Sequence, residues 1–404
     1  MVRLSPTSRF DRPLSISEYY LASLGTTAGP VKPVDAVFIF EGDGPDFHAR
    51  EWREALDRAA AKNPGSRIRL IGHSWFSRWT TDAPPPLVRI VDRTDWHGMS
   101  GDGGEFFNAL PISIENGPVV ELTLVNQSPR GRLVILRTPH AVMDGRGALH
   151  FLAEIFRALR GEPLLGSNAP FSDAQLMRQF KPSDAMPRLP HPDRLTGPPD
   201  NDAPGDEWRR ITLRASGRNI VSRIADATAR YTHRHSDGPA LFGVAVDLRR
   251  HVPGLISTAN FFGVPVIPLH KGESAAVFRE RLANALDRRM ECHIPPPGHL
   301  LKLLPRRWID RLLARHTGYN PRKPHIHTLG ISNLGRIDTA LYSFPGFAMR
   351  SCFVIPLQGT NVTIMGVDDR LELAINIPKA FAGNGRFDAF EAHLTKHLTE
   401  SDGQ

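Results

Sequence analysis

A proline-rich segment in the middle of the chain limits most strongly how these 404 residues can fold. Residues Lys181 to Glu207 contain seven prolines and almost no apolar pattern, so they predict an extended linker. On both sides of this segment, apolar runs with strand spacing alternate with stretches of strong helix formers. The chain is also longer than one hydrophobic core usually fills. We therefore expect two α/β units, residues 1–180 and 208–404, joined by a linker at residues 181–207.

The composition is that of an ordinary soluble globular protein, with 41% hydrophobic and 23% charged residues. The first residues lack the apolar core of a signal peptide, and no window approaches the ~20 apolar residues of a membrane span. The two cysteines, Cys292 and Cys352, show no metal-ligand spacing. These features predict a cytoplasmic protein with no membrane span.

The charge balance is basic, with a net charge of +8 and a pI of about 9.8, which favours anionic partners. The densest basic stretch runs from Leu304 to His316. It is either the solvated face of a helix or a surface for an anionic partner. No RNA- or DNA-reading motif accompanies it, so we expect no nucleic-acid partner.

The sequence RTPHAVMDGRG, residues 137–147, joins an apolar strand to a helix. The run before it is apolar without alternation, which is typical of a strand covered on both faces. After it, apolar residues recur at helical spacing. His140 and Asp144 therefore lie at a junction where a sheet holds side chains and a loop exposes them. A neutral imidazole accepts a proton at physiological pH, so His140 is a candidate general base.

The segment PHAVMDG resembles the HxxxDG signature of the chloramphenicol-acetyltransferase-like, CoA-dependent acyltransferase superfamily. That superfamily includes the condensation domains of nonribosomal peptide synthetases, the polyketide-associated acyltransferases, wax-ester synthases and the plant acyltransferases. Residues 47–70, 242–269 and 331–338 resemble further family segments in the same order, and ISNLGRID resembles the SNLG element of the polyketide-associated and alcohol-acylating branches. The resemblance covers nearly the whole chain. It implies an α/β fold of two chloramphenicol-acetyltransferase-like sandwich subdomains in a pseudo-twofold arrangement, with an active-site tunnel at their interface.

The same resemblance implies the chemistry. An acyl group would move from a phosphopantetheine thioester, either acyl-CoA or a carrier protein, to a hydroxyl or amine of a natural product or lipid. The expected partners are a small-molecule acceptor and an acyl or peptidyl carrier protein, with no permanently bound cofactor. Many condensation domains carry two histidines in the motif, and here Pro139 replaces the first. The family base is the second, which this chain keeps as His140.

In the family the motif aspartate turns away from the histidine and pairs with an arginine of the second half. Carried onto this sequence, the partner of Asp144 is Arg249, with Arg250 as the second choice. A buried carboxylate without such a partner would be costly. Gly145 either brings free N–H groups of the following helix to the developing oxyanion or is a plain turn glycine.

Other residues are candidates for substrate contacts. Asn333 and Asn260 either orient substrate in the tunnel or are ordinary turn asparagines, and Ser332 is a weaker candidate for the oxyanion. The basic stretch would meet the phosphates of CoA or an acidic carrier protein. Its arginines are Arg306, Arg307, Arg311 and Arg315.

Two kinds of alternative remain at this stage. A metal site would combine His140 and Asp144 with His325 and His327, which is not a recognised ligand spacing, so we expect no metal. The rival functions are a standalone nonribosomal-peptide-type condensation enzyme with a carrier-bound donor and a non-catalytic binding module of the same fold.

Overall fold

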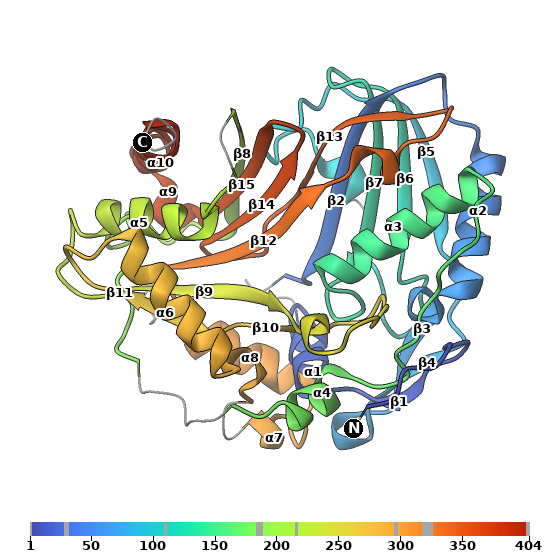
Figure 1. Cartoon of the computed structure of the whole chain (residues 1–404), viewed down its shortest axis with the longest axis horizontal. Helices are drawn as coiled ribbons and strands as arrows, with labels where there is room; N and C mark the ends of the chain where they lie inside the picture. Colours follow the sequence, from blue (N-terminus) through green and yellow to red (C-terminus); the bar gives the residue numbers. More distant parts are fainter. Residues whose placement is uncertain are drawn as a thin grey trace.

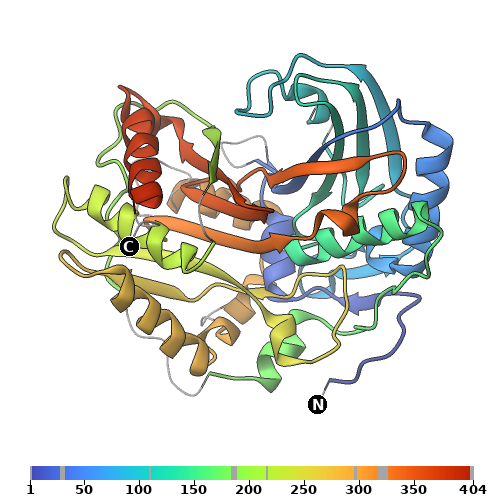
Figure 2. The same ribbon diagram turned by 45° about the horizontal axis from the view of Figure 1, so that its top comes forward.

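The computed structural model describes residues 2–27, 32–108, 111–182, 189–214, 217–294, 298–316 and 326–400. The chain forms two α/β halves that lie side by side, each around its own main sheet (Figure 1). Figure 2 shows an orange segment from the second half of the sequence, which crosses to the blue and teal strands of the first half. The two halves are therefore linked by more than the connection expected from the sequence.

The first half is built on a five-stranded sheet in the order β13-β2-β7-β6-β5. Its central strands are covered on both faces, which explains their unbroken apolar runs. Phe38 and Leu136 pack in the core beneath α2 and α3, whereas Ile39 and Ile135 pack on the opposite face with Trp96. The elements are β2 (Asp35–Asp43), α2 (Ala49–Lys62), β5 (Leu87–Arg93), β6 (Glu121–Gln127), β7 (Arg132–Pro139), α3 (Gly145–Leu159) and β13 (Ala348–Val354).

A second, three-stranded sheet and two helices lie beside this sheet. Ser15 and Glu18 form a capping box that starts the helix α1, a signal that the sequence carries as Ser-x-x-Glu. The short strands form a three-stranded sheet in the order β1-β4-β3. The elements are β1 (Asp11–Pro13), α1 (Ile16–Ser23), β3 (Ile68–Ile71), β4 (Arg78–Thr81) and α4 (Asp173–Gln179).

The second half is built on a sheet in the order β10-β9-β12-β14-β15-β8, with β11 also paired to β9. Phe242 of β9 meets Phe278 of α6 edge to face, with ring centroids 5.4 Å apart. The elements are β8 (Asp206–Arg214), α5 (Ile220–Thr232), β9 (Ala240–Asp247), β10 (Phe262–Gly263), β11 (Val266–Leu269), α6 (Ala275–Asp287), α7 (Gly298–Leu301), α8 (Arg306–His316), β12 (Leu329–Ile337), β14 (Asn361–Val367), β15 (Arg370–Pro378), α9 (Lys379–Ala382) and α10 (Arg386–Glu400).

The strand expected before the motif and the helix expected after it are confirmed as β7 and α3. Within the expected linker, the described residues 181–182 and 189–205 form no helix or strand, and 183–188 lie outside the described residues. Not all of residues 208–404 pack within the second half. The strand β13 pairs antiparallel with β2 of the first half, and α8 packs on α1.

A buried ion-pair network ties the two halves together at this crossing. Arg210 of β8 is 2% exposed and contacts both carboxylate oxygens of Glu41 on β2, at 2.6 and 3.0 Å. Its Nε also donates to Glu372 at 2.9 Å, and its Nη2 donates to Ser351 of β13 at 3.0 Å. Burial alone would raise the pKa of Glu41, but Arg210 and Arg130 outweigh it and hold that pKa below its usual value. Glu41 is therefore a paired, ionised carboxylate.

Replacing Arg210 tests this network. Arg210→Met leaves two buried carboxylates without their main partner, so we expect the free energy of unfolding to fall by roughly 3–5 kcal/mol in urea titrations. Arg214→Met is the matched control on the same strand, because the Arg214 side chain is 85% exposed. The control should change stability by less than about 0.5 kcal/mol. Equal effects of the two substitutions would contradict the role of the network.

Candidate active site

The histidine of the motif lies in the loop between β7 and α3. Its backbone N–H donates to the carbonyl of Val34 at 2.7 Å, which fixes the loop against the chain entering β2. The ring lies against Phe262 of β10, with centroids 5.3 Å apart and planes tilted by 56°. His140, from the first half, therefore faces a residue of the second half.

The environment of His140 favours the neutral ring. Burial lowers the pKa of His140 below its ordinary value, although its own backbone carbonyl, the charge of Asp144 and the side chain of Asn260 oppose the shift. Within the described part of the chain, Nδ1 is buried and has no hydrogen-bond partner. The residue as a whole is partly buried, and its Nδ1 edge is enclosed by protein.

The aspartate of the motif is fully occupied by other partners. Asp144 caps α3 by accepting from the N–H of Gly147 at 2.6 Å. It receives both terminal nitrogens of Arg249, at 2.9 and 3.1 Å, and the N–H of Phe261 at 2.6 Å. Four donors fill the acceptor positions of one carboxylate. Asp144 is therefore not a direct hydrogen-bond partner of His140.

The arginine that meets Asp144 is itself saturated. Besides the carboxylate of Asp144, Arg249 donates to Asp247 at 2.9 Å and to the carbonyls of Ser257 and Ala259 at 3.1 and 2.6 Å. Burial alone would lower the pKa of Arg249, but the charges of Asp144 and Asp247 outweigh it and raise that pKa. The structure thus brings together the pair that the resemblance implied. Arg250, the second choice, instead lies 3.9 Å from Glu291.

Two glycines let the loop approach the second half closely. A Cβ at Gly145 would lie 2.6 Å from the Cδ2 atom of Leu334. A Cβ at Gly147 would lie 2.3 Å from the carbonyl oxygen of Thr258 and 2.7 Å from its carbonyl carbon. The contact at Gly145 involves the tip of a side chain, whereas the contact at Gly147 involves backbone. Gly147, which the sequence did not single out, is therefore the tighter of the two.

The other predicted polar residues have different surroundings. Asn260 is fully buried and donates to the carbonyl of Ala141 at 2.8 Å, while its Oδ1 has no hydrogen-bond partner within the described residues. Asn333 is exposed, and its Oδ1 accepts from the N–H of Gly335 at a bulge in β12. Ser332 is partly exposed on the same strand. The structure thus brings Asn260 to the His140 loop and gives Asn333 a turn contact.

A pocket of about 540 Å³ opens beside the motif. Pro139 and Ala141, the two neighbours of His140, line it together with Arg306 and Arg307, whereas His140 is not among the lining residues. The sequence did not predict that the N-terminal helix α1 would form part of this wall. The larger apolar side chains of the wall are Tyr19, Leu21, Leu24, Val34, Ile112 and Ile114.

The four arginines of the basic helix α8 are not equivalent. Arg306 donates to the carbonyl of Ala22 at 3.0 Å and forms an ion pair with Glu115, so it holds α8 against the first half. Arg307 is exposed and lines the pocket. Arg311 and Arg315 are exposed and are not among the residues that line it.

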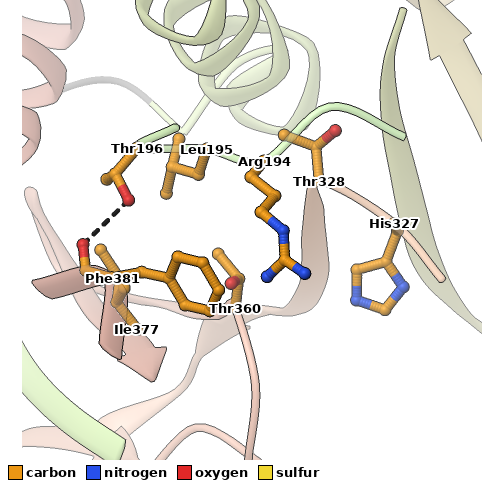
Figure 3. Close-up of a pocket in the computed structure, with 8 residues that line it drawn as sticks. All are labelled: Arg194, Leu195, Thr196, His327, Thr328, Thr360, Ile377 and Phe381. Carbon is orange, nitrogen blue, oxygen red and sulfur yellow. Dashed lines mark hydrogen bonds between the residues drawn. The ribbon is translucent and has the colours of Figure 1, made fainter. Parts of the chain in front are cut away.

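A second, small cavity lies in the other half (Figure 3). Arg194, Phe381 and His327 surround it, with the guanidinium of Arg194 4.4 Å from the ring centroid of Phe381. Its volume is about 10 Å³, room for about one water molecule. Among the described residues no group of three His, Cys, Asp or Glu side chains is placed to hold a metal, and His325 lies outside those residues.

Comparisons with known proteins identify the fold. No family model matches the chain, and no curated protein matches it. Solved structures do match it along its length. The starter condensation domain of rhizomide synthetase RzmA matches with a TM-score of 0.63 and 13% identity, over 98% of this chain and 97% of that one. The chain has the condensation-domain fold.

Two further structures share that fold. The condensation domain of the Monacolin K polyketide synthase MokA matches with a TM-score of 0.66 and 12% identity, over 98% of this chain and 99% of that one. The epimerization domain TycB3(E) of tyrocidine synthetase B matches with a TM-score of 0.57 and 13% identity, over 99% and 96%. These matches establish the condensation-domain arrangement of two pseudo-symmetric subdomains. In the described residues, no helix is long and apolar enough to cross a membrane.

The glycine contacts lead to a prediction that separates two positions of the motif. Gly147→Ala should lower the melting temperature more than Gly145→Ala, because backbone at Thr258 cannot rotate away as the Leu334 side chain can. Overpacking of this kind typically costs about 1–3 kcal/mol. Thermal unfolding of the two variants, measured side by side, checks the order. A larger loss for Gly145→Ala would contradict the assigned contacts.

Proposed function

We propose that this protein is an acyltransferase that moves an acyl group from a phosphopantetheine thioester to a hydroxyl or amine of a natural product or lipid, with His140 as general base. The observation that carries the proposal is the state of His140. Its pKa is lowered by burial, and its neighbouring carboxylate is fully engaged elsewhere. The ring is therefore proposed as a neutral base next to a substrate-sized pocket, which is lined by its chain neighbours Pro139 and Ala141.

The proposed reaction needs one base and no acyl-enzyme. Nδ1 is enclosed by protein, so we assign the role of proton acceptor to Nε2. Nε2 takes the proton of the acceptor as its oxygen or nitrogen attacks the thioester carbonyl. The tetrahedral intermediate then collapses, the C–S bond breaks, and the imidazolium returns the proton to the departing thiolate. The products are the ester or amide and the free phosphopantetheine thiol.

The start of α3 is the candidate oxyanion site. The first N–H groups of a helix have no partner within the helix, and Asp144 takes only that of Gly147. The N–H of Gly145 is therefore proposed to stabilise the negative charge on the carbonyl oxygen. Ser332 remains the weaker candidate for this role, and Asn333 is proposed to contact substrate only through its exposed edge.

Two observations support a phosphopantetheine donor. Arg307 lines the pocket and is exposed, so it is placed for a phosphate group of the donor, with Arg306, Arg311 and Arg315 adding positive charge around it. A complex of the RzmA starter condensation domain with C8-CoA and Leu-SNAC shares this fold, with a TM-score of 0.66 at 12% identity. The donor acts as a substrate.

The alternative is a standalone condensation enzyme that takes its acyl group from a carrier protein. The condensation-domain neighbours favour it, whereas Pro139 in the first histidine position favours general acyl transfer. A non-catalytic module would not need to keep a histidine in this loop beside the pocket. Turnover with octanoyl-CoA alone, compared with octanoyl carrier protein, separates the two enzymatic possibilities.

Loss of the base tests the proposal. His140→Ala should reduce the rate of acyl transfer from octanoyl-CoA to a panel of amines and alcohols by about 10²–10⁴, because a positioned general base contributes that much. Release of free CoA thiol measures the rate, and the variant should still unfold cooperatively, because Nδ1 of His140 has no hydrogen bond to lose within the described residues. His48→Ala, an exposed histidine at the start of α2, is the control and should keep full activity.

The pH dependence of the wild type gives a second readout of the same claim. Burial lowers the pKa of His140 below the ordinary histidine value of about 6.5, so the ring stays neutral to lower pH. We therefore expect kcat/KM to stay constant as the pH falls to that value and to decline only at lower pH. Near-normal turnover by a folded His140→Ala variant would refute the assignment.

A further inference from the structure

A concentration of exposed hydrophobic side chains lies around the mouth of the pocket. In the described part of the chain, 14 large hydrophobic side chains are exposed, and seven of them come from two short segments. Phe76 is 74% exposed and Trp308 is 57% exposed. We call this group the rim patch. Its members are Trp75, Phe76, Leu300, Leu303, Leu304, Trp308 and Leu312.

The two segments of the rim patch adjoin each other. The hydroxyl of Tyr19 on α1 donates to the carbonyl of Leu304 at 2.7 Å, and the Nζ atom of Lys302 lies 5.5 Å from the ring centroid of Trp75. Residues 72–74 and 305–307 line the same pocket. Figure 1 shows α7 and α8 beside α1, the helix that forms a wall of that pocket. The rim patch is therefore one surface at the pocket mouth.

A row of positive charge borders this surface. Arg307, Arg311 and Arg315 recur every four residues on α8, so they share one side of the helix, and all three are exposed. The nearby acidic groups are engaged elsewhere. Asp310 is buried and accepts from the N–H groups of Gly25 and Thr27 at 2.9 and 2.8 Å, and Glu115 pairs with Arg306. The arginine row therefore presents net positive charge outward.

Aromatic and aliphatic side chains beside a row of arginines are the composition of a segment that lies in a bilayer interface. Tryptophan and leucine enter the boundary between headgroups and acyl chains, while arginines attract anionic headgroups. Exposed apolar clusters of this size mark interaction surfaces. We propose that the rim patch binds the surface of an anionic lipid bilayer, so that the pocket opens directly onto the membrane. This goes beyond the proposed acyl transfer, which does not require it.

Vesicle binding by the full chain tests the proposal. We expect the protein to co-sediment with vesicles of phosphatidylcholine and phosphatidylglycerol in a 7:3 ratio, to bind phosphatidylcholine vesicles far more weakly, and to be released by 0.5 M salt. Exposed charges are screened within roughly 3–5 Å at such ionic strength. Brominated lipids should quench part of the tryptophan fluorescence, because Trp75 and Trp308 are exposed while Trp52, Trp79 and Trp96 are buried.

Paired variants locate the binding surface. Trp308→Ser with Leu312→Ser should weaken binding to the anionic vesicles at least tenfold. Arg311→Ala with Arg315→Ala should weaken it roughly 30-fold, since each basic residue near the surface contributes ~1 kcal/mol. The matched control is Leu165→Ser with Leu341→Ser, which are 57% and 42% exposed outside the rim patch. The control should bind as the wild type does.

Several outcomes would overturn the proposal. These are no binding to anionic vesicles, equal binding by the Trp308 and Leu312 variant, or equal loss in the control. A wild-type dimer that this variant converts to a monomer would assign the patch to a second copy, and capture of an acidic carrier protein without vesicle binding would assign it to that protein. His140→Ala should bind vesicles normally, so failure of the acyl-transfer proposal would be seen separately.

Discussion

The buried ion pair between Asp144 and Arg249 is the interaction on which the site depends. It joins Asp144, the N-cap residue of α3, to Arg249 in a short 3-10 helix (Leu248–His251) of the second half, with two hydrogen bonds at 2.9 and 3.1 Å. A buried pair of this kind is weak evidence for net stability, because desolvating two charges offsets much of their attraction. Its effect is positional: neither partner can move away without leaving a buried charge unpaired. The pair thereby fixes where the loop of His140 meets the second half.

The segment that follows Arg249, residues 257–263, makes further contacts with the motif. Thr258 lies against Gly147, Asn260 donates to Ala141, and Phe262 lies against the ring of His140. Each contact brings a residue within 257–263 to a residue within 139–147. The site is therefore a product of both halves, and its geometry follows from their docking. The buried Arg210 network, together with the pairing of β13 with β2, holds the same two halves on another side.

Local patterns in the sequence were sufficient for much of the fold. The unbroken apolar run of β7 and the helical spacing of α3 predicted a covered strand followed by a helix, and both are present. The resemblance to the superfamily predicted that Asp144 pairs with Arg249, which lies 105 residues later in the sequence. The place of α1 in the pocket wall was not predicted, because it depends on tertiary packing.

What the sequence did not reveal depends on long-range partners. The strand β13 has no local feature that names β2 as its neighbour, so the crossing between halves could not be predicted. The basic run of α8 was uniform as a sequence, yet Arg306 pairs with Glu115 while Arg307 lines the pocket. Asn333 was readable as either a site residue or a turn residue, and only the fold showed its contact with Gly335.

A double-mutant cycle in urea unfolding tests the central claim most directly, that the Asp144 and Arg249 pair joins the two halves. Asp144→Asn and Arg249→Met should each cost roughly 3–5 kcal/mol, because each leaves a buried charge without its partner. The double variant should cost less than the sum of the two, with a coupling energy of about 2–3 kcal/mol. Arg250→Met, at the half-exposed neighbouring arginine, should change stability by less than about 0.5 kcal/mol. Additive single effects, with no coupling between Asp144 and Arg249, would contradict the account.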